Sequence, residues 1–232
     1  MYKIINNYKI YAFQSKEEFL ERIVNEKKIL VAMNAEKIVK EDDILIDIVN
    51  RNIGYPDGFG AVIALRSKGA KAVKIAGSEF WLDIIKKFHK SRSFYLIGST
   101  EKVIINTVKR LKEEYPNINI TGYKNGFFKE GDKASVIENL IDKKPDIIFV
   151  AQGTPKQELL MNELLKEHQA LYMGLGGSFD IYGGDKKRVP LLFLKLELEW
   201  FYRLVQEPTR ISRQMALIKF FIKGILSTIK GK

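Results

Sequence analysis

The stretch Ile147–Glu158 carries the residue pattern of a phosphate-binding site. It begins with an apolar run, typical of a buried parallel strand, and continues through Gly153 to Thr154. We predict that Thr154 is the N-cap of a helix, because proline follows it and Gln157 stands three residues after the cap. A helix that begins directly after a strand directs free backbone N–H groups and the positive end of its dipole toward one point, where phosphates bind.

The same pattern also has a purely structural interpretation. Strand–helix joints with good caps are common without any ligand, so these residues by themselves leave both interpretations open. The two histidines, His89 and His168, lie on predicted amphipathic helices and are expected to be surface residues. Because the chain has no cysteine and only these two histidines, a zinc site or a histidine-based catalytic triad is not expected.

Two further polar positions stand in segments predicted to be irregular. Ile53–Gly60 is predicted to be a turn, since its Pro-Asp-Gly run is a strong turn signal. Its Asp57 can cap the next helix, form an Asx-turn or act chemically as a carboxylate. Gly176–Pro190 is predicted to be a long glycine-rich loop, a kind of loop that is often functional. There, Asp180 can accept a hydrogen bond from a ribose or a base, or be an ordinary turn residue.

The elements that must position these residues alternate along the chain. The expected strands are a pair within residues 2–13, then Lys28–Met33, Lys71–Ala76, Ser93–Gly98, Asn117–Thr121, Ile147–Val150 and Ala170–Gly174. The expected helices begin at Ser15, Asn34, Asp42, Gly60, Ser78, Thr100, Asp132 and Pro155. This alternation predicts an α/β, Rossmann-like fold: a mostly parallel sheet with helices on both faces.

In such sheets, ligands bind beyond the C-terminal ends of the strands. The positions at or near these ends are Asn34, Asp57, Gly98, Gly122, Gly153 and the run Gly174–Asp180. Their convergence favours a ligand site at this edge. The sequence contains neither a GxGxxG fingerprint nor a P-loop, so a nucleotide would be bound in another way.

The charge and hydrophobicity of the chain limit the classes of partner that it is expected to bind. The 232-residue chain has a formal net charge of +11, which favours an anionic partner: a phosphorylated substrate, an anionic membrane surface or nucleic acid. No apolar run approaches the roughly 18–20 residues of a membrane span, and the N-terminus lacks the apolar core of a signal peptide. We therefore expect a cytoplasmic protein.

The character of the sequence changes near Leu191. We predict an α/β core over residues 1–190 and a helical, basic, amphipathic appendage over residues 191–232. No acidic residue follows Glu207, and four lysines stand among bulky apolar residues at helical spacing. Such a helix can lie on an anionic bilayer or pack on its own domain. Nucleic acid is disfavoured, because the basic residues follow an apolar stripe and no nucleic-acid-binding motif is present.

Several motifs together resemble the WecG/TagA/CpsF glycosyltransferases, family 26, from about Lys28 to Phe221. They are NAEK (Asn34–Lys37), DG (Asp57-Gly58), GYKNGFF (Gly122–Phe128), GTPKQE (Gly153–Glu158), MGLGGSFD (Met173–Asp180), KRVP (Lys187–Pro190) and EWFYRLVQEPTRISRQ (Glu199–Gln214). The wording of the first and fifth is closer to the enterobacterial common antigen branch, which transfers N-acetylmannosaminuronic acid, than to the teichoic acid branch.

The resemblance implies an inverting, metal-independent transferase without a cofactor. It would move an N-acetylmannosamine-type sugar from a UDP donor to polyprenyl-diphosphate-linked N-acetylglucosamine, at the inner face of the cytoplasmic membrane. In the family, the aspartate of the DG motif is the proposed general base, which here is Asp57. A carboxylate suits this role because it can take the proton of a sugar hydroxyl as that hydroxyl attacks.

The resemblance also implies the other site residues. Asn34 and Arg203 join Asp57 as catalytic residues, and Arg203 would approach a diphosphate, whose charge needs stabilisation. The substrate-binding positions are Gly153, Thr154, Gln157, Gly176, Gly177, Asp180, Phe127, Arg188, Arg210 and Arg213. Arg210 and Arg213 can instead contact lipid headgroups only. Ala32 stands where the teichoic acid branch has a threonine implicated in catalysis.

Alternatives stay open at this point. A non-catalytic UDP-sugar-binding or scaffold protein of the same pathway would share many of these motifs. The expected partners are the UDP-sugar, the lipid-linked acceptor and an anionic membrane surface, with no nucleic acid. Self-association is also expected to be possible. A uronate donor would need an additional cation, which Lys186, Lys187 or Arg188 can supply.

Overall fold

The computed structural model describes residues 1–40 and 42–184. Its strands are β1 (Tyr2–Ile5), β2 (Tyr8–Tyr11), β3 (Ile29–Met33), β4 (Ile53–Pro56), β5 (Ser93–Gly98), β6 (Asn119–Lys124), β7 (Ile147–Ala151) and β8 (Leu171–Gly174). Its helices are α1 (Lys16–Ile23), α2 (Ala35–Val39), α3 (Asp43–Arg51), α4 (Phe59–Ser67), α5 (Gly77–Phe88), α6 (Glu101–Glu114), α7 (Asp132–Lys143), α8 (Lys156–Glu167) and α9 (Ser178–Tyr182).

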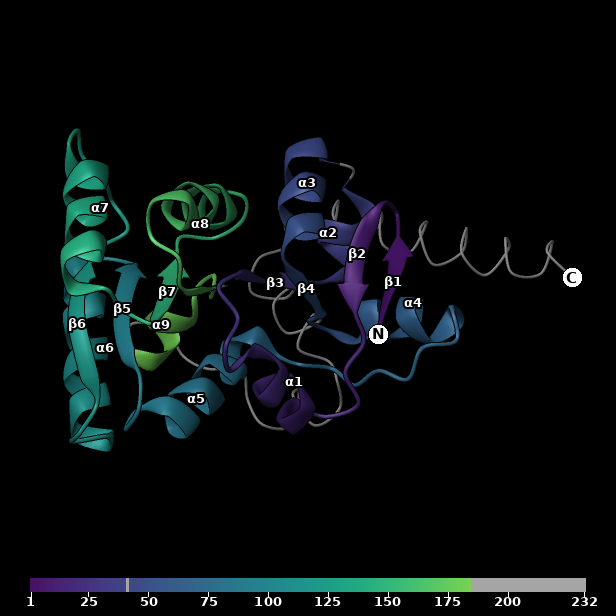
Figure 1. Cartoon of the computed structure of the whole chain (residues 1–232), viewed down its shortest axis with the longest axis horizontal. Coiled ribbons are helices and arrows are strands. Elements are labelled where there is room, and N and C mark those ends of the chain that lie inside the picture. Colours follow the sequence, from purple (N-terminus) through teal and green to yellow (C-terminus); the bar gives the residue numbers. More distant parts are fainter. Residues whose placement is uncertain (41, 185–232) are drawn as a thin grey trace, which may run out of the picture.

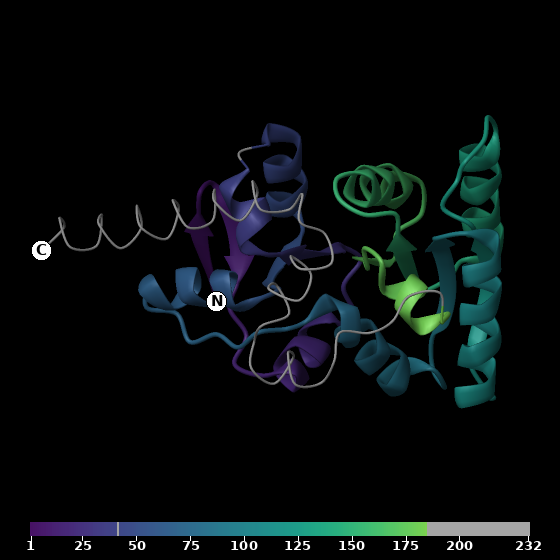
Figure 2. The same ribbon diagram turned by 180° about the vertical axis from the view of Figure 1, so that it is seen from behind.

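Within the described residues, the strands form one eight-stranded sheet in the order β1-β2-β4-β3-β8-β7-β5-β6. The hairpin pair β1–β2 is antiparallel, and every other neighbouring pair is parallel. The hairpin lies at one end of the sheet, while β6 lies at the other with α6 and α7 (Figures 1 and 2). The predicted mostly parallel sheet is therefore confirmed.

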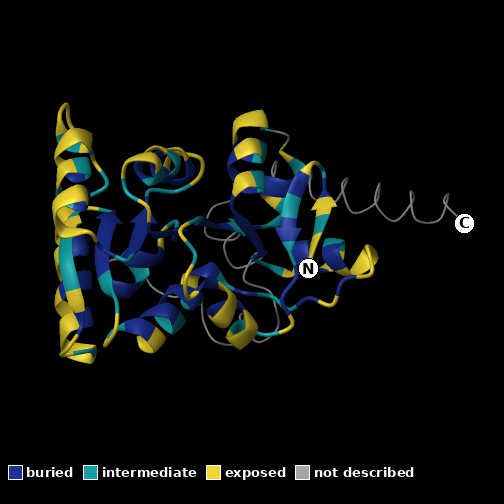
Figure 3. Cartoon of the chain, viewed as in Figure 1, coloured by how far each residue is buried: buried dark blue, intermediate teal, exposed yellow. Residues whose placement is uncertain are grey.

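Two apolar layers enclose this sheet, and alternate residues of each strand enter opposite layers. Phe149 packs in one layer with α1, α5, α6 and α9, whereas its neighbours Ile148 and Val150 pack in the other with α3, α4, α7 and α8. Because the inner strands are covered on both faces, they read as continuous apolar runs, and they are buried along their length (Figure 3). The α/β fold class with helices on both faces is confirmed.

Four predicted helix starts are confirmed by side-chain caps. The side chains of Ser15, Asn34, Asp42 and Thr100 each accept a hydrogen bond from the backbone N–H three residues later. The donor–acceptor distances are 3.1, 2.9, 3.1 and 3.3 Å, respectively. Such caps depend on residues three positions apart, which makes them readable from sequence.

The prediction of a turn beginning at Ile53 is wrong. Residues Ile53–Pro56 form the buried strand β4, paired with β3 from Leu30 to Met33. A Cβ on Gly54 would lie 2.8 Å from the carbonyl oxygen of Lys9, so glycine is what lets β2 and β4 pack side by side. The proline is the strand's last residue, where the ladder ends, and it does not disrupt the pairing.

The predicted strand Lys71–Ala76 is also wrong, and so is the predicted cap Ser78. The segment makes two separate backbone bonds, from Val73 to Phe13 and from Ile75 to Pro56, each 2.9 Å, and no ladder is assigned to it. Helix α5 begins one residue before Ser78 and has Ala76 as its N-cap residue. The segment makes single backbone bonds to two different segments and no ladder with one strand.

None of the helices in residues 1–40 and 42–184 combines the length and apolar character that crossing a bilayer requires. The predicted appendage, residues 191–232, lies outside the described residues, as does the boundary at residue 190. The expected division into two domains therefore stays a prediction.

Candidate active site

The C-terminal ends of four neighbouring strands, β4, β3, β8 and β7, carry most of the expected site residues. The backbone N–H of Asp57, just after β4, donates to the carbonyl oxygen of Met33 at the end of β3, over 2.9 Å. Across β8, the N–H of Gly176 donates to Oε1 of Gln157 on α8, also over 2.9 Å. These bonds tie segments distant in sequence into one edge, as the strand pattern predicted.

Asp57 occupies the junction between β4 and α4. Its Oδ1 accepts a hydrogen bond of 3.2 Å from the backbone N–H of Gly77, the first residue of α5. The idea that it caps the next helix is therefore wrong: α4 has no side-chain cap, and the aspartate instead serves α5, 20 residues further on. Asp57 is partly exposed, so its carboxylate is positioned by the fold while remaining accessible to a substrate.

Asn34 follows β3 and caps α2. Its Oδ1 accepts a hydrogen bond of 2.9 Å from the backbone N–H of Lys37. This structural role accounts for an asparagine at the position without any chemistry. Any catalytic contribution of Asn34 would therefore have to be made while its oxygen serves as the cap.

A buried ion pair, which the sequence analysis did not identify, crosses this edge. Lys37 Nζ lies 2.7 Å from Glu158 Oε1, and their side chains are 10% and 1% exposed. The same ammonium donates to the carbonyl oxygen of Ala32 over 2.9 Å. Both residues stand in motifs noted above, NAEK and GTPKQE, but nothing local indicated that they would meet.

Glu158 also organises the loop that precedes α8. Its Oε1 accepts hydrogen bonds from the hydroxyl of Thr154 at 3.0 Å and from Nε2 of Gln157 at 3.1 Å. Gln157 in turn accepts the hydrogen bond from Gly176. Its side chain can reach across β8 because Gly174 has no Cβ, which would lie 2.6 Å from Nε2 of Gln157. One buried carboxylate thus orders two expected binding residues directly and reaches a third through Gln157.

The prediction that Thr154 is an N-cap is wrong. Helix α8 begins at Lys156, its N-cap residue is Pro155, and no side chain caps it. The Thr154–Pro155 peptide bond is cis. The threonine hydroxyl donates to Glu158 and therefore belongs to the ion-pair network, while the backbone N–H of Gln157 donates to the carbonyl oxygen of Gly153 over 2.9 Å.

Tyr55 of β4 lies beneath this network. Within the described residues, its buried hydroxyl has no hydrogen-bond partner, and neither does Oε2 of Glu158. Burial raises the pKa of Tyr55 well above its usual value, and the negative charges of Asp57 and Glu158 raise it further. The phenol is therefore neutral, and these two buried polar atoms lack a hydrogen-bond partner in the part of the chain that the structure describes.

A second group of site residues gathers at the end of β5. The hydroxyl of Ser99 donates to Oδ1 of Asp180. Gly126 is held by bonds from its N–H to Ser99 O, 2.8 Å, and from Nε2 of Gln152 to its own carbonyl, 2.8 Å. The NGFF loop and the segment carrying Asp180 thus meet between the ends of β5 and β7.

The predicted loop Gly176–Pro190 is only partly irregular where it is described. Residues Ser178–Tyr182 form the short helix α9, because Phe179 and Tyr182, three residues apart, both pack on Trp81. Asp180 is therefore a helix residue and not a turn residue.

The remaining expected binding residues differ in what surrounds them. Phe127 is 70% exposed, at the tip of the NGFF loop. At Gly153 and Gly176, no atom of the described chain lies within 4 Å of the place where a Cβ would stand. A Cβ on Gly177 would be 3.6 Å from Oδ2 of Asp180. The backbone at the first two glycines is therefore open to a ligand that approaches this edge.

The expected cationic residues Arg188, Arg203, Arg210 and Arg213 lie outside the described residues, as do Lys186 and Lys187. Among the residues with described positions, no three histidine, aspartate or glutamate side chains come together as a group able to hold a metal ion. The expected independence from metal stays a prediction.

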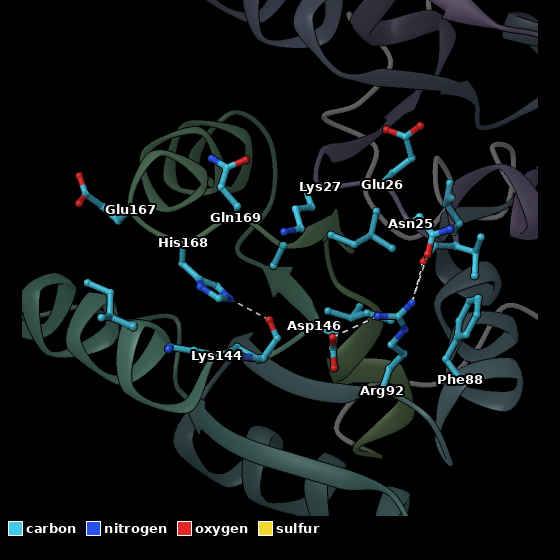
Figure 4. Close-up of a pocket in the computed structure, with 17 residues that line it drawn as sticks. Asn25, Glu26, Lys27, Phe88, Arg92, Lys144, Asp146, Glu167, His168 and Gln169 are labelled. Atoms are coloured by element: carbon cyan, nitrogen blue, oxygen red, sulfur yellow. Dashed lines mark hydrogen bonds and ion pairs between the residues drawn. The ribbon is translucent and has the colours of Figure 1, made fainter.

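A separate cavity of about 630 Å³ opens at the opposite edge of the sheet, around the N-terminal ends of β5, β7 and β8 (Figure 4). Three of its lining side chains have hydrogen-bonding partners: Arg92 bonds to Asp146 at 3.3 Å, and His168 Nε2 contacts the carbonyl oxygen of Pro145 at 2.8 Å. Burial alone would raise the pKa of Asp146, but hydrogen bonds from Ser93 and Arg92 outweigh it and lower the pKa. The contacts of Arg92, Asp146 and His168 join the ends of helices and strands, so these residues have a structural role.

Gly98 provides a test of how the second group is built. It has a φ of +141°, and a Cβ there would lie 2.7 Å from the carbonyl carbon of Ala151. Gly98→Ala is therefore expected to lower the free energy of unfolding by about 2–4 kcal/mol. Urea denaturation would measure the loss. Gly131→Ala is the control, since Gly131 also has a positive φ but open space around its Cβ position; equal losses would contradict the role of the Ala151 contact.

Comparison with known protein families gives a match over almost the whole chain. The model of the family described as glycosyl transferase WecG/TagA/CpsF matches residues 4–232. The match includes the described core as well as the segment beyond residue 184.

Proposed function

The chain belongs to the WecG/TagA/CpsF glycosyltransferase family and is thus a glycosyltransferase. On this basis, we propose that it transfers an N-acetylmannosamine-type sugar from a UDP donor. The proposed acceptor is polyprenyl-diphosphate-linked N-acetylglucosamine, in the synthesis of a cell-surface polysaccharide. The sugar is N-acetylmannosaminuronic acid or N-acetylmannosamine, and the closeness of the NAEK and LGGSFD wording to the common-antigen branch favours the uronate.

The observation that carries this proposal is the position of Asp57. It is a partly exposed carboxylate at the C-terminal strand edge, held by the backbone of α5 and joined to the end of β3. In the proposed step, the acceptor hydroxyl oxygen attacks the anomeric carbon and its proton passes to Asp57. The bond between that carbon and the UDP oxygen breaks on the opposite face, and UDP leaves with the electron pair, so the configuration inverts.

The donor's diphosphate is proposed to lie over Gly153 and Gly176. The open backbone at these glycines supports this placement, as does the N-terminus of the 12-residue helix α8, whose dipole favours negative charge. Gln157 joins the two segments through Gly176. Arg203, Arg210 and Arg213 are proposed to add positive charge as the diphosphate leaves, without a metal ion.

The partners follow from the acceptor. A lipid-linked acceptor lies in a membrane, so the proposed enzyme works as a peripheral protein on the inner face of the cytoplasmic membrane. The basic, apolar sequence of residues 191–232 supports contact with anionic lipid. We also propose that the protein can self-associate, and we assign no described surface to this contact.

A second candidate is a non-catalytic UDP-sugar-binding or scaffold protein of the same pathway. It is less well supported, because a scaffold would not require a carboxylate held at the strand edge beside the nucleotide loops. Turnover distinguishes the two directly.

The test is transfer by the purified full chain. UDP-N-acetylmannosamine and its uronate would be offered in parallel, with a short-chain polyprenyl-diphosphate N-acetylglucosamine and a chelator. We expect product with one donor and release of one UDP per product. UDP binding by calorimetry is the control measurement: binding without transfer of either sugar would favour the scaffold, and the absence of both would contradict the proposed donor class.

A further inference from the structure

Helix α9, which carries Asp180, is too short to hold its own position. It has 5 residues, whereas an isolated helix needs roughly 12–15 to be even marginally stable in water. Packing must therefore place it. The rings of Phe179 and Tyr182 meet Trp81 of α5 edge to face, with centroids 5.6 and 5.1 Å apart. Helix α9 also lies against α6 (Figures 1 and 2). Contacts with these two helices thus decide where Asp180 lies.

Three side chains join the end of α9 to α6. The guanidinium of Arg110 lies over the ring of Tyr182, 4.2 Å from its centroid, and its Nη1 donates to the carbonyl oxygen of Tyr182 over 3.0 Å. Glu114 accepts from both: Oε1 from Nε of Arg110 and Oε2 from the hydroxyl of Tyr182, each over 2.7 Å. We name these three side chains the α6–α9 clamp. A Cβ on Gly183 would lie 2.9 Å from the carbonyl oxygen of Val103, so the two helices are in close contact here.

The clamp gains strength from its buried member. An ion pair as exposed as Arg110 and Glu114, 52% and 39%, ordinarily contributes little, but Tyr182 is only 7% exposed. Burial raises the pKa of the Tyr182 phenol, and its bond to Glu114 raises it further. Burial alone would raise the pKa of the Glu114 carboxyl, but the bonds from Tyr182 and Arg110 outweigh it and lower the pKa. At neutral pH the phenol is therefore a donor and the carboxylate an acceptor.

Asp180 itself meets a fixed point at the strand edge. Ser99, just after β5, has a φ of +56°, in the left-handed region that residues other than glycine seldom adopt. Its N–H donates to the carbonyl oxygen of Ala151 over 3.1 Å, and its own carbonyl oxygen accepts from the N–H of Gly126 over 2.8 Å. Held in this way, Ser99 cannot follow a displaced helix. The bond from its hydroxyl to Asp180 therefore requires that other contacts place α9 correctly.

The clamp lies away from the strand edge. Helix α6 begins at Glu101, just after β5, and Arg110 is roughly 14 Å further along its axis. We propose that Arg110, Glu114 and Tyr182 are positioning residues for donor binding, which act by holding Asp180 in place at the strand edge. This deepens the proposed function and rests on it, because the UDP donor and its contact with Asp180 are themselves proposals.

Two substitutions in the full chain break the clamp in different ways. Arg110→Met removes the guanidinium, and Tyr182→Phe keeps the ring contacts but loses the hydroxyl that bonds to Glu114. The matched control is Lys109→Met, since Lys109 pairs with Glu113 within α6, at 4.0 Å, and both side chains are mostly exposed. Arg110→Met and Lys109→Met each remove one positive charge, so any general attraction for anionic UDP changes equally in both.

The first measurement needs no ligand. Hydrogen exchange followed by mass spectrometry reports on the amides of residues 178–184 in each purified variant. We expect Arg110→Met to speed exchange there at least about fivefold, because a helix held by fewer contacts opens more often. Lys109→Met should leave the exchange rate within about twofold of the unsubstituted chain. Equal rates in the two variants would overturn the proposal, because the clamp would then not hold α9.

The second measurement is UDP affinity by calorimetry. Arg110→Met and Tyr182→Phe should each raise the Kd for UDP about three- to thirtyfold, and Lys109→Met less than about twofold. In an Asp180→Ala background, Arg110→Met should add less than about twofold, because the group through which it acts is gone. In transfer assays the loss should fall on the KM for the donor more than on kcat.

Two results of the calorimetry would overturn the route through Asp180. One is an equal rise in Kd from Arg110→Met with and without Asp180→Ala, which is the result expected of a general loss of structure. The other is normal UDP affinity in Asp180→Ala alone.

Failure of the clamp and failure of the proposed function give different results. An unsubstituted chain that does not bind UDP would contradict the proposed donor class, while hydrogen exchange would still decide whether the clamp holds α9. A chain that binds UDP but transfers no sugar would contradict the proposed transfer alone. A chain that transfers sugar, with UDP affinity equal in Arg110→Met and Lys109→Met, would contradict the clamp alone.

Discussion

Asp57→Asn is expected to lower the turnover number by about 10²–10⁴-fold while leaving UDP affinity unchanged. The amide cannot take the proton of the attacking hydroxyl, but its oxygen can still accept the bond from the N–H of Gly77 that Oδ1 accepts now. The start of α5 therefore keeps its partner, and the substitution isolates the proton transfer from the local structure. Initial rates at saturating donor and calorimetry with UDP measure the two quantities.

Asp42→Asn is the matched control for this prediction. Asp42 is the N-cap of α3, and its carboxylate accepts from the N–H of Leu45 at 3.1 Å. Asparagine caps helices as well as aspartate does, so this variant should keep both turnover and UDP affinity. Near-normal turnover in Asp57→Asn would show that another group is the base.

Lys37→Met is expected to lower the free energy of unfolding by about 3–5 kcal/mol. The substitution leaves the carboxylate of Glu158, 1% exposed, without its buried counter-ion. A loss of this size is a large share of the roughly 5–15 kcal/mol that holds a domain together. Because Glu158 also holds Thr154 and Gln157, UDP should bind more weakly as well. Urea denaturation and calorimetry measure the two effects.

Two further variants make this prediction specific. Lys133→Met breaks a pair of similar length, 2.8 Å to Glu163, but both side chains are about half exposed, so it should cost less than about 1 kcal/mol. The double variant Lys37→Met with Glu158→Gln removes both buried charges and should recover much of the lost stability. If Lys37→Met lowers the free energy of unfolding no more than Lys133→Met does, burial does not make the Lys37–Glu158 pair more stabilising than an exposed pair.

Much of the fold was predictable because its determinants are local. Apolar runs of strand length indicated β3, β5, β7 and β8, and cap residues three positions from their donors located α1, α2, α3 and α6. The alternation of these elements then required a parallel sheet covered on both faces. The same logic placed Asn34, Asp57 and Gly153 at one edge, where the structure has them.

The errors share one cause, which is that distant contacts decided the outcome. A glycine and a proline made β4 look like a turn. Gly54 is instead a strand residue whose missing Cβ leaves room for the carbonyl oxygen of Lys9 on the neighbouring strand β2. Lys71–Ala76 was predicted to be a strand, yet it pairs with no neighbour over a ladder. Thr154 looked like a cap, yet its hydroxyl is used by Glu158.

The sequence by itself therefore determined the fold class, the family, and the edge of the sheet at which the candidate site residues stand, because periodicity, caps and motif wording act over short separations. Only the tertiary structure decided which side chains meet at that edge. Lys37 and Glu158 are 121 residues apart, and Asp57 serves a helix that begins 20 residues later. Such pairs form because parallel strands bring their C-terminal ends together, and no local rule specifies which polar groups are then buried face to face.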